Sequence, residues 1–280
     1  MTVELRGLKD KVAFVTGAGR GQGANHARQL AKAGCDVAVL DICEPMPPLY
    51  ATATAEDLEL TAKQVRAEGR RSLALQCDVR DEDAVAAAAE RALEEFGHID
   101  ILINNAGMAA LDTIHEIRSD VLHAVIDTNV KGPMFCAKYL VGDMIGRRSG
   151  TIINISSAVI GSGHAMLSHY VASKHAVVGL TKSWATELSE FDINVNAIAP
   201  ATIRPGEGQG GSGMVLGLSE AMEMDPDEAF EVFSEQGNLP GDKWRAEMQD
   251  ITDAVLFLAS DNARMITGHV LHVDCGQATR

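Results

Sequence analysis

The sequence predicts a single α/β domain, built on a doubly wound, seven-stranded parallel sheet with helices on both faces. Short apolar segments with strand character alternate with longer helical segments along the 280 residues, and this alternation is typical of parallel sheets. Residues 1–280 suit one large domain, since neither an internal repeat nor a linker divides them. A hydrophobic content of 46% with 22% charged residues is typical of a globular protein.

Charge and cysteine content exclude several classes of protein. The net charge of −15 disfavours nucleic acids and anionic membranes as partners, because both bind basic surfaces. No apolar run is long enough to span a bilayer, and the first residues contain no segment typical of a signal peptide. The five cysteines are scattered without zinc-ligand spacing, so we expect reduced thiols, no metal site and a cytoplasmic location.

The first predicted strand, residues 11–16, runs directly into a glycine-rich loop and then into a helix at residues 24–33. This succession indicates a dinucleotide site, because the free N–H groups at a helix N-terminus bind a pyrophosphate. The glycines stand at positions 17, 19, 21 and 23, so the loop has the pattern TGxxxGxG. It does not match the alternative pattern GxGxxG, because the sixth position counted from Gly17 is Gln22. An ordinary tight turn is the alternative interpretation of such a loop.

The second predicted strand, residues 36–41, ends on a carboxylate that can accept hydrogen bonds from the hydroxyls of an adenosine ribose. Asp41 would also repel a 2′-phosphate, which favours NAD over NADP. Arg20 in the glycine loop favours the opposite choice, but neither Ile42 nor Cys43 adds a second base. NAD is therefore the predicted cofactor, and a solvated acid at a strand end is the alternative for Asp41.

Residues 44–54 interrupt the alternation as an insertion. Its prolines at positions 45, 47 and 48 exclude a helix and favour an extended backbone. The next helix is predicted for residues 56–68, with Thr54 and Asp57 as a capping box and Gly69 as its end.

The remaining segments continue the alternation. Strands are predicted at residues 72–77, 99–104, 151–155, 193–199 and 268–273. Helices are predicted at residues 81–96, about 114–144, 170–188 and 251–259. Residues 204–245 combine a glycine-rich stretch with two short helices separated at Pro226, and we interpret them as a substrate lid. Five apolar residues there suit either a pocket or core packing: Met222, Met224, Phe230, Phe233 and Trp244.

Three residues carry the predicted chemistry. Tyr170 and Lys174 stand four residues apart in a predicted helix, so their side chains share one face. Ser157 follows a predicted strand, at the carboxyl end where open α/β sheets bind ligands. A hydroxyl, a phenol and an ammonium group suit proton transfer to or from a carbonyl or alcohol oxygen while another agent moves the hydride. Taken alone, a Tyr–Lys pair is more often a surface tyrosine beside a solvated lysine, and the nearby His164 and His169 receive no role.

Taken in order, the motifs resemble those of the short-chain dehydrogenase/reductase family. They are TGAGRGQG, Asp41, Asp78-Val79, NNAG at 104–107, Asn129, INISS at 153–157, YVASK at 170–174, INVNAIAP at 193–200 and ITGHVLHVD at 266–274. The similarity covers about residues 9–276, and the set is specific although each motif alone is weak. The resemblance implies a single-domain Rossmann fold and a dehydrogenase or reductase activity.

The resemblance also implies roles for individual residues. Tyr170 would be the acid/base, Lys174 its partner and a ligand of the nicotinamide ribose, and Ser157 a hydrogen-bond partner of the reacting oxygen. Asn129 would hold a water that links Lys174 to solvent, and Ser156 would be a supporting neighbour. A free phenol has a pKa of about 10, so the ammonium group and the oxidised nicotinamide are expected to favour phenolate. The expected cofactor contacts are Gly17, Gly19, Arg20, Gly21, Gln22, Gly23, Asp41, Ile42, Cys43, Asp78, Val79, Asn105, Ala106, Gly107, Tyr170, Lys174, Pro200, Ala201 and Ile203.

The chain departs from the family pattern after the sixth strand, where Ala201 and Pro205 stand in place of the usual Gly and Thr. The Thr hydroxyl contact to the cofactor carboxamide is thereby lost, while backbone contacts from Ala201 and Ile203 remain expected. The insertion at 44–54 and the sequence DICEP resemble a carveol-dehydrogenase-like subgroup, which implies coupling to mycofactocin, a peptide-derived redox carrier. The family resemblance further implies a homotetramer.

These expectations together describe an NAD-dependent oxidoreductase acting on a secondary alcohol or ketone. The acidic lid disfavours phosphorylated and CoA-linked substrates, so an uncharged apolar ring of terpenoid or steroid type is expected. One alternative is a 3-oxoacyl-carrier-protein-type reductase, which would favour NADPH and need basic residues to dock an acidic carrier. Another is a catalytically silent nucleotide-binding scaffold, which the intact set of Asn129, Ser157, Tyr170 and Lys174 disfavours.

Overall fold

A seven-stranded parallel sheet forms the centre of the computed structural model, which describes residues 4–46, 52–205, 213–234 and 245–279. The strands follow the order β3-β2-β1-β4-β5-β6-β7, and each neighbouring pair is parallel. Their bounds are β1 (Val12–Thr16), β2 (Asp36–Asp41), β3 (Ser72–Gln76), β4 (Ile101–Asn104), β5 (Gly150–Ile155), β6 (Ile193–Pro200) and β7 (Val270–Val273). The predicted fold class and all seven predicted strands are confirmed.

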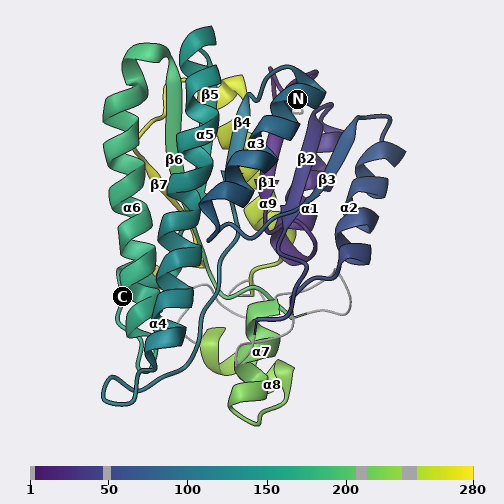
Figure 1. Ribbon diagram of the computed structural model, residues 1–280. Helices are drawn as coiled ribbons and strands as arrows, with labels where there is room; N and C mark the ends of the chain where they lie inside the picture. Colours follow the sequence, from purple (N-terminus) through teal and green to yellow (C-terminus); the bar gives the residue numbers. More distant parts are fainter. Residues whose placement is uncertain (1–3, 47–51, 206–212, 235–244, 280) are drawn as a thin grey trace.

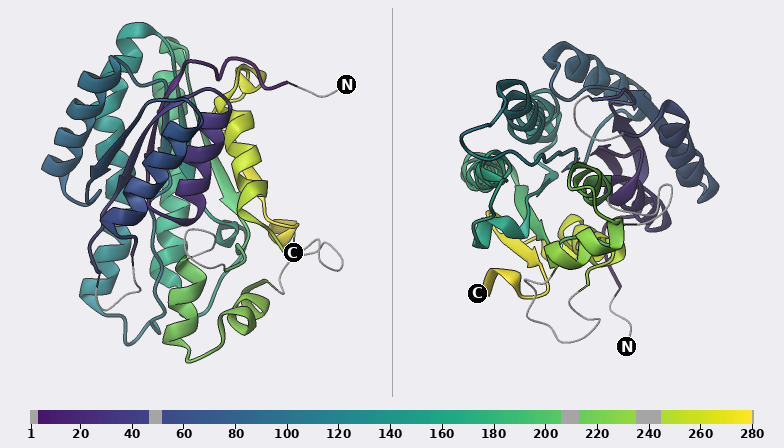
Figure 2. Two further views of the ribbon diagram at one scale, coloured as in Figure 1. Left: turned by 90° about the vertical axis from the view of Figure 1, so that its right-hand side faces the viewer. Right: turned by 90° about the horizontal axis from the view of Figure 1, so that it is seen from below.

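Two layers of helices cover the sheet (Figure 1, Figure 2). One face is covered by α1 (Gly21–Lys32), α2 (Ala55–Ala67) and α9 (Met248–Ala259). The other is covered by α3 (Glu82–Phe96), α5 (Gly132–Arg147) and α6 (Ser168–Leu188). Beyond the carboxyl ends of the strands, at the bottom of Figure 1, lie α7 (Gly213–Ala221) and α8 (Pro226–Ser234).

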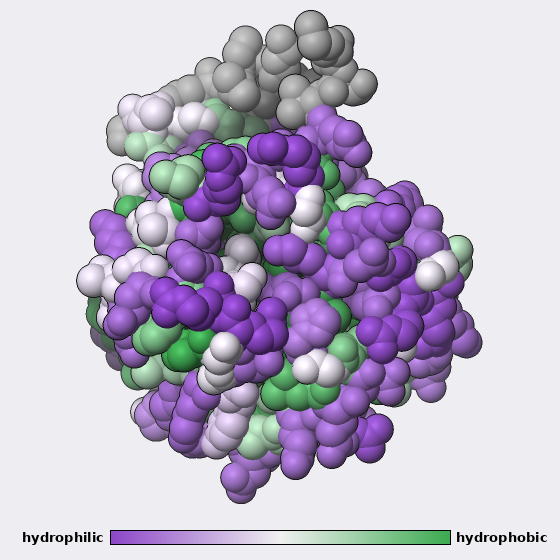
Figure 3. Space-filling view, turned by 90° about the horizontal axis from the view of Figure 1, so that it is seen from above, coloured by the Kyte–Doolittle hydropathy of each residue, from purple (hydrophilic) through white to green (hydrophobic). Residues whose placement is uncertain are grey.

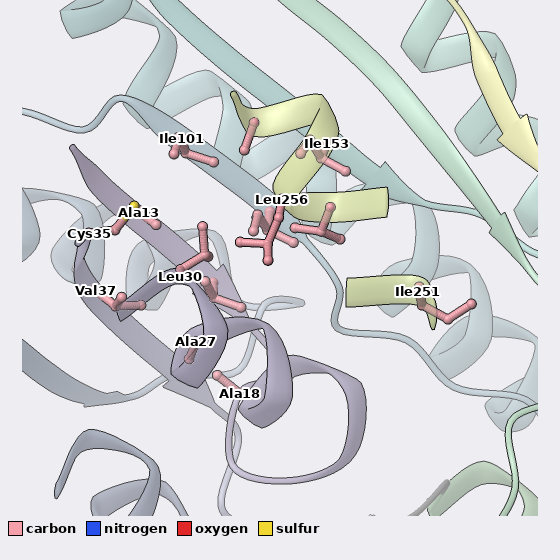
Figure 4. Packing of buried hydrophobic residues seen from close by; sticks show 14 of the residues in the cluster. Ala13, Ala18, Ala27, Leu30, Cys35, Val37, Ile101, Ile153, Ile251 and Leu256 are labelled. Atoms are coloured by element: carbon pink, nitrogen blue, oxygen red, sulfur yellow. The ribbon is translucent and has the colours of Figure 1, made fainter. Parts of the chain in front are cut away.

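Small and β-branched apolar residues fill the space between the sheet and its helices. All five residues of β1 are buried, as expected for a central parallel strand that is covered on both faces. Figure 4 shows how side chains of α1 and α9 meet those of the sheet on one face. The labelled residues of this cluster are Ala13, Ala18, Ala27, Leu30, Cys35, Val37, Ile101, Ile153, Ile251 and Leu256.

The predicted helix at 114–144 is wrong in its start and in its continuity. The structure has α4 (Ser119–Ile126), a π-helical turn at Asp127–Lys131, and then α5. Pro133, in the first turn of α5, has no N–H and cannot donate the α-helical hydrogen bond to the carbonyl group of Asn129. The regular α-helical hydrogen bonds are interrupted here, and Asn129 lies in the wider π-helical turn. Such turns are frequent at functional sites.

The insertion joins the sheet to α2 as expected at its described ends. Thr54 caps α2 through the predicted capping box with Asp57, and Gly69 beyond the helix has a φ of +76°. The hydroxyl group of Thr52 donates to the carbonyl oxygen of Glu44 over 2.6 Å, which ties the two sides of the insertion together. Residues 47–51, with two of its three prolines, lie outside the described residues.

The helices, the surface and the clusters of polar side chains have three further general features. No helix within the described ranges combines the length and apolar character needed to cross a membrane. Seen from the end opposite α7 and α8, the surface is mostly hydrophilic, with apolar residues scattered among charged ones (Figure 3). The described part of the chain contains no group of three or more His, Cys, Asp or Glu side chains suited to a metal ion.

A buried polar network joins α1 to α9. Thr252 donates its hydroxyl proton to the carbonyl of Met248, so it can accept from both Asn25 Nδ2 and His26 Nδ1, each 2.8 Å from its Oγ1. His26 is fully buried, and its Nε2 has no hydrogen-bond partner among the described residues. Protonation would add a buried charge there, and burial accordingly lowers the pKa of His26 to about 3.

We predict that His26 makes the protein less stable in mild acid. An unfolded histidine binds a proton below about pH 6.5, whereas folded His26 binds one only near pH 3, so stability falls as the pH drops through this window. Between pH 7 and pH 5 the loss from this group is about 2 kcal/mol. Denaturant unfolding of the parent and of His26→Gln at both pH values measures the difference. Identical pH dependence in the two proteins would contradict the prediction.

Candidate active site

A cavity with about 1700 Å³ of empty space, including its open mouth, lies at the carboxyl edge of the sheet. Strand order reverses between β1 and β4, and open α/β sheets bind ligands in the crevice at such a point. The wall of the cavity runs from the β1–α1 loop and the ends of β2 and β3, past the ends of β4 and β5, to α6, α7 and α8. The cavity is therefore elongated across most of the sheet.

The glycine loop is folded so tightly that side chains are excluded from it. Gly17 has a φ of +64°, and a Cβ atom there would lie 2.9 Å from the Cα of Ala106. A Cβ atom on Gly23 would lie 2.1 Å from the carbonyl oxygen of Gly17. The helix that follows begins at Gly21, three residues earlier than predicted, so its N-terminus lies in the wall of the cavity. This arrangement fits a dinucleotide pyrophosphate.

Asp41 lines the cavity and is held by the glycine loop. Burial raises the pKa of its carboxyl group, while backbone N–H groups of Gly19, Cys43 and Ile42 and the charge of Arg20 act in the opposite direction. The bond from the N–H of Gly19 to Asp41 Oδ2 measures 2.9 Å. This carboxylate is therefore partly desolvated and fixed in position, which disfavours a freely solvated acid at the end of a strand.

Arg20 also lies in the wall, and it reaches toward α7. A Cβ atom on Gly213, at the start of α7, would lie 2.5 Å from Arg20 Nη2. The guanidinium group thus packs against the segment after β6 while its charge acts on Asp41. The structure places both groups that bear on the choice between NAD and NADP at the same end of the cavity.

Most of the expected cofactor contacts line this cavity. They are Gly17, Arg20, Gly21, Gln22, Asp41, Ile42, Asp78, Val79, Asn105, Ala106, Gly107, Tyr170, Lys174, Pro200, Ala201 and Ile203. Three others, Gly19, Gly23 and Cys43, lie behind the wall. Gly19 and Cys43 direct their N–H groups to Asp41, and Gly23 allows the close approach of Gly17. They support the wall rather than forming its surface.

The three predicted catalytic side chains meet at the middle of the cavity wall. Tyr170 and Lys174 come from α6, and Ser157 follows β5. The hydroxyl group of Ser157 acts on the phenol of Tyr170 and lowers its pKa. Lys174 Nζ donates to the carbonyl oxygen of Ile155 over 2.9 Å and lies 5.6 Å from the ring centroid of Tyr170. The prediction that these residues come together is confirmed, and a surface tyrosine beside a solvated lysine is excluded because both side chains are buried.

Burial has the largest effect on the pKa values of Tyr170 and Lys174. It raises the pKa of Tyr170, against the effect of the hydrogen bond from Ser157, and it lowers the pKa of Lys174 to about 8. The expectation that the pKa of the Tyr170 phenol is lowered is therefore wrong for the protein without a cofactor. Lys174 still carries its proton at pH 7, because its pKa lies above that value.

Asn129 stands behind the catalytic side chains and does not line the cavity. Its Oδ1 accepts from the N–H of Met108, and its Nδ2 donates to the Met108 carbonyl and to Ser173 Oγ, each over 2.9 Å. Ser173 in turn donates to the carbonyl oxygen of Tyr170 over 2.7 Å. Asn129 therefore ties the π-helical turn to α6 and to the segment after β4. Ser156 has a similar supporting role, since its hydroxyl group donates to the carbonyl oxygen of Lys174.

The remaining wall of the cavity is largely apolar and was only partly predicted. From α7 and α8 it includes Met214, Val215, Leu218 and Phe233. Of the five apolar residues proposed for this region, Phe233 alone is found in the wall within the described ranges. Phe230 is fully buried in the core, Met222 and Met224 lie elsewhere, and Trp244 is outside the described residues. The sequence around the α7 residues did not predict that they line the cavity, because glycine and serine flank them.

The chain was compared with known proteins. Residues 11–209 match the family described as short chain dehydrogenase. The protein belongs to this family and is an oxidoreductase. It is 37% identical to (-)-trans-carveol dehydrogenase of Rhodococcus erythropolis, over 96% of this chain and 98% of that protein. It is 38% identical to a 3-oxoacyl-[acyl-carrier-protein] reductase of Staphylococcus aureus, over 95% and 97%.

A solved structure is also similar along its whole length. Carveol dehydrogenase from Mycobacterium avium in complex with NAD superposes with a TM-score of 0.89 at 36% identity, covering 99% of this chain and 100% of that one. The similarity therefore includes the elements that form the cavity wall.

We predict that Gly23→Ala weakens dinucleotide binding by about tenfold or more, or about 1.4 kcal/mol. The added methyl group would collide with the Gly17 carbonyl and displace the loop. Isothermal titration calorimetry with NAD measures the effect. Gly142→Ala on α5 is the matched control, since a Cβ atom there meets nothing within 4 Å and affinity should be unchanged. Equal affinities of the two variants would show that the tight loop is not needed for binding.

Proposed function

We propose that the protein is an NAD-dependent dehydrogenase that interconverts an uncharged secondary alcohol and its ketone. The observation that carries the proposal is one continuous wall, which joins the glycine loop and Asp41 to Ser157, Tyr170 and Lys174. The carveol dehydrogenase relative from Mycobacterium avium was solved with NAD, which supports the same cofactor here.

Bound NAD supplies the chemistry of accepting or returning a hydride. The side chains of the protein then transfer one proton and stabilise the reacting oxygen atom of the substrate. Tyr170 takes the proton of the substrate hydroxyl, or returns it to the ketone oxygen, at its phenolic oxygen. Ser157, whose hydroxyl group acts on the same phenol, then directs its single hydroxyl proton to the reacting oxygen as the charge of that oxygen changes.

Lys174 supports this proton transfer through its charge. Its ammonium group persists at neutral pH and lies close to the Tyr170 ring, so it stabilises a phenolate electrostatically. Burial otherwise opposes the phenolate, because it raises the pKa of Tyr170. We propose that the positive charge of oxidised nicotinamide provides the rest of the stabilisation when NAD is bound.

Asn129 is proposed to serve the proton path from Lys174 to solvent. Its side chain is engaged by Met108 and Ser173, so its backbone carbonyl is the group suited to hold a water molecule. Pro133 supports this role because it cannot donate an α-helical hydrogen bond to that carbonyl.

The apolar wall from α7 and α8 supports an apolar cyclic substrate, of terpenoid or steroid type, with residues 204–245 acting as a lid. The resemblance to an acyl-carrier-protein reductase favours a second candidate, a 3-oxoacyl reductase. Two features oppose it, because the net charge of −15 would repel an acidic carrier and Asp41 would repel the phosphate of NADPH. Oxidation of cyclic alcohols with NAD, against reduction of a 3-oxoacyl thioester with NADPH, separates the two.

Three further expectations belong to the same proposal. The protein is proposed to be a cytoplasmic homotetramer, in keeping with its five free cysteines and its family. An external redox carrier of the mycofactocin type is proposed to reoxidise its cofactor. The insertion at 44–54 is proposed to cover the adenosine end, since Met46, Thr52 and Ala53 line the cavity.

We predict that Tyr170→Phe lowers kcat by about 100-fold or more, because it removes only the transferable proton. The variant should keep its fold and its affinity for NAD. Absorbance at 340 nm with a panel of cyclic secondary alcohols measures the rate, and calorimetry measures cofactor binding. Turnover within about tenfold of the parent, near 1.4 kcal/mol of barrier, is incompatible with Tyr170 as the acid/base.

We predict that the parent strongly prefers NAD to NADP and that Asp41→Ala narrows the preference by about tenfold. The substitution removes the charge that repels a 2′-phosphate, while Arg20 remains to attract it. The ratio of kcat/KM for the two cofactors is the measurement, and Asp120→Ala on the exposed start of α4 is the control. A parent that uses NADP better than NAD would show that Arg20 outweighs Asp41.

A further inference from the structure

Two polar side chains lie in the wall of the cavity beyond the catalytic residues. His164 comes from the segment between Ser157 and α6, and Gln277 comes from the 3-10 turn Gln277–Thr279 near the C-terminal end. Gln277 Nε2 lies 3.5 Å from His164 Nε2, although 113 residues separate them. Most of the other side chains that α7, α8 and the Ser157–α6 segment contribute to the wall of the same cavity are apolar, namely Val159, Leu167, Met214, Val215, Leu218 and Phe233.

The C-terminal turn is held firmly in this position. The carboxylate of Asp274 accepts from the N–H groups of Gly276 and Ala278, over 2.9 and 2.8 Å, and its carbonyl accepts from the N–H of Gln277. Ala278 packs so closely on Gly161 that a Cβ atom there would lie 2.8 Å away. Gln277 is 6% exposed, so a polar side chain is kept in a largely desolvated wall at a fixed place.

His164 is hydrogen bonded through one ring nitrogen. Ser162 Oγ lies 3.2 Å from His164 Nε2, and the contact from Gln277 reaches the same atom. Within the described residues Nδ1 makes no hydrogen bond. Burial lowers the pKa of His164, so the ring is neutral at pH 7 and offers one donor and one acceptor. Nδ1 can therefore form a hydrogen bond with a ligand, as donor or as acceptor according to the tautomer.

Among the described residues of the cavity wall, the charged groups lie elsewhere. They are Arg20, Asp41, Asp78 and Lys174, which come from the glycine loop, the ends of β2 and β3, and α6. A hydroxyl or carbonyl group buried in an apolar pocket costs free energy unless a protein group pairs with it. A neutral imidazole and an amide in a largely apolar part of the cavity wall therefore suit an uncharged oxygen atom of the substrate.

We propose that His164 and Gln277 bind a second, uncharged oxygen of the substrate, so that the protein acts on cyclic alcohols or ketones that carry a further hydroxyl or carbonyl group. This proposal rests on the proposed function, because the first oxygen is the one that faces Ser157 and Tyr170. His164 and Gln277 determine specificity and take no part in the proton transfer. A site that hydrogen bonds a substrate oxygen discriminates against an analogue that lacks this oxygen, because the analogue forgoes a hydrogen bond to desolvated side chains.

The test compares two alcohols that differ by one hydroxyl group. They are 4-isopropylcyclohexanol and 4-(2-hydroxypropan-2-yl)cyclohexanol of the same ring stereochemistry, each oxidised with NAD. The parent should show a higher kcat/KM for the hydroxylated alcohol. His164→Leu and Gln277→Met should each lower the ratio of the two kcat/KM values by about tenfold, as expected for one lost hydrogen bond in a buried site. The ratio is taken within one preparation, so it does not depend on the fraction of folded enzyme.

His115→Phe is the matched control, because this histidine lies on the exposed segment before α4 with a side chain 76% exposed. Its ratio should equal that of the parent. A parent without preference for the hydroxylated alcohol, or a preference that both cavity variants retain, would overturn the assignment of His164 and Gln277 while leaving the dehydrogenase function intact. Oxidation of neither alcohol by the parent would overturn the proposed function together with this inference.

Discussion

The contact between the ends of β1 and β4 is the constraint on which the site depends. Asn105 donates from Nδ2 to the carbonyl oxygens of Thr16 and Gly17, over 2.9 and 3.1 Å. The hydroxyl oxygen of Thr16 accepts from the N–H groups of Asn105 and Ala106. These bonds hold together the two strands between which the order of the sheet reverses, so the glycine loop and the segment after β4 face each other across one crevice. A side chain on Gly17 or Gly23 would force them apart.

Desolvation is the second physical theme of the site. Asp41, Tyr170 and Lys174 are all withdrawn from water, and burial moves the pKa of each toward its neutral form. Specific partners oppose that effect at two of them, namely backbone N–H groups at Asp41 and the hydroxyl of Ser157 at Tyr170. The protonation states of these three side chains therefore depend strongly on neighbouring charges and hydrogen-bond partners. Such sensitivity suits a reaction in which the charge of the cofactor ring and of the substrate oxygen changes.

The two halves of the cavity are built in different ways. The half that contains the glycine loop and Asp41 comes from strand ends and a loop that follow one another along the chain, from β1 to β4. The other half collects residues from the segment after Ser157, from α7 and α8, and from the last turn at Gln277. Asp274 and Gly161 fix that turn through backbone hydrogen bonds and close packing. The shape of this half therefore depends on contacts between segments far apart in the chain.

The sequence by itself determined the sheet, the glycine loop, the cap at Thr54 and the approach of Ser157 to Tyr170 and Lys174. These follow from apolar periodicity, glycine and proline chemistry, and the geometry of a helix face, which all act over a few residues. Tertiary structure alone decided the π-helical turn around Asn129, the shifted pKa of Tyr170 and the meeting of His164 with Gln277. Each of these depends on burial or on partners distant in the chain, and no local pattern of residues encodes such distances.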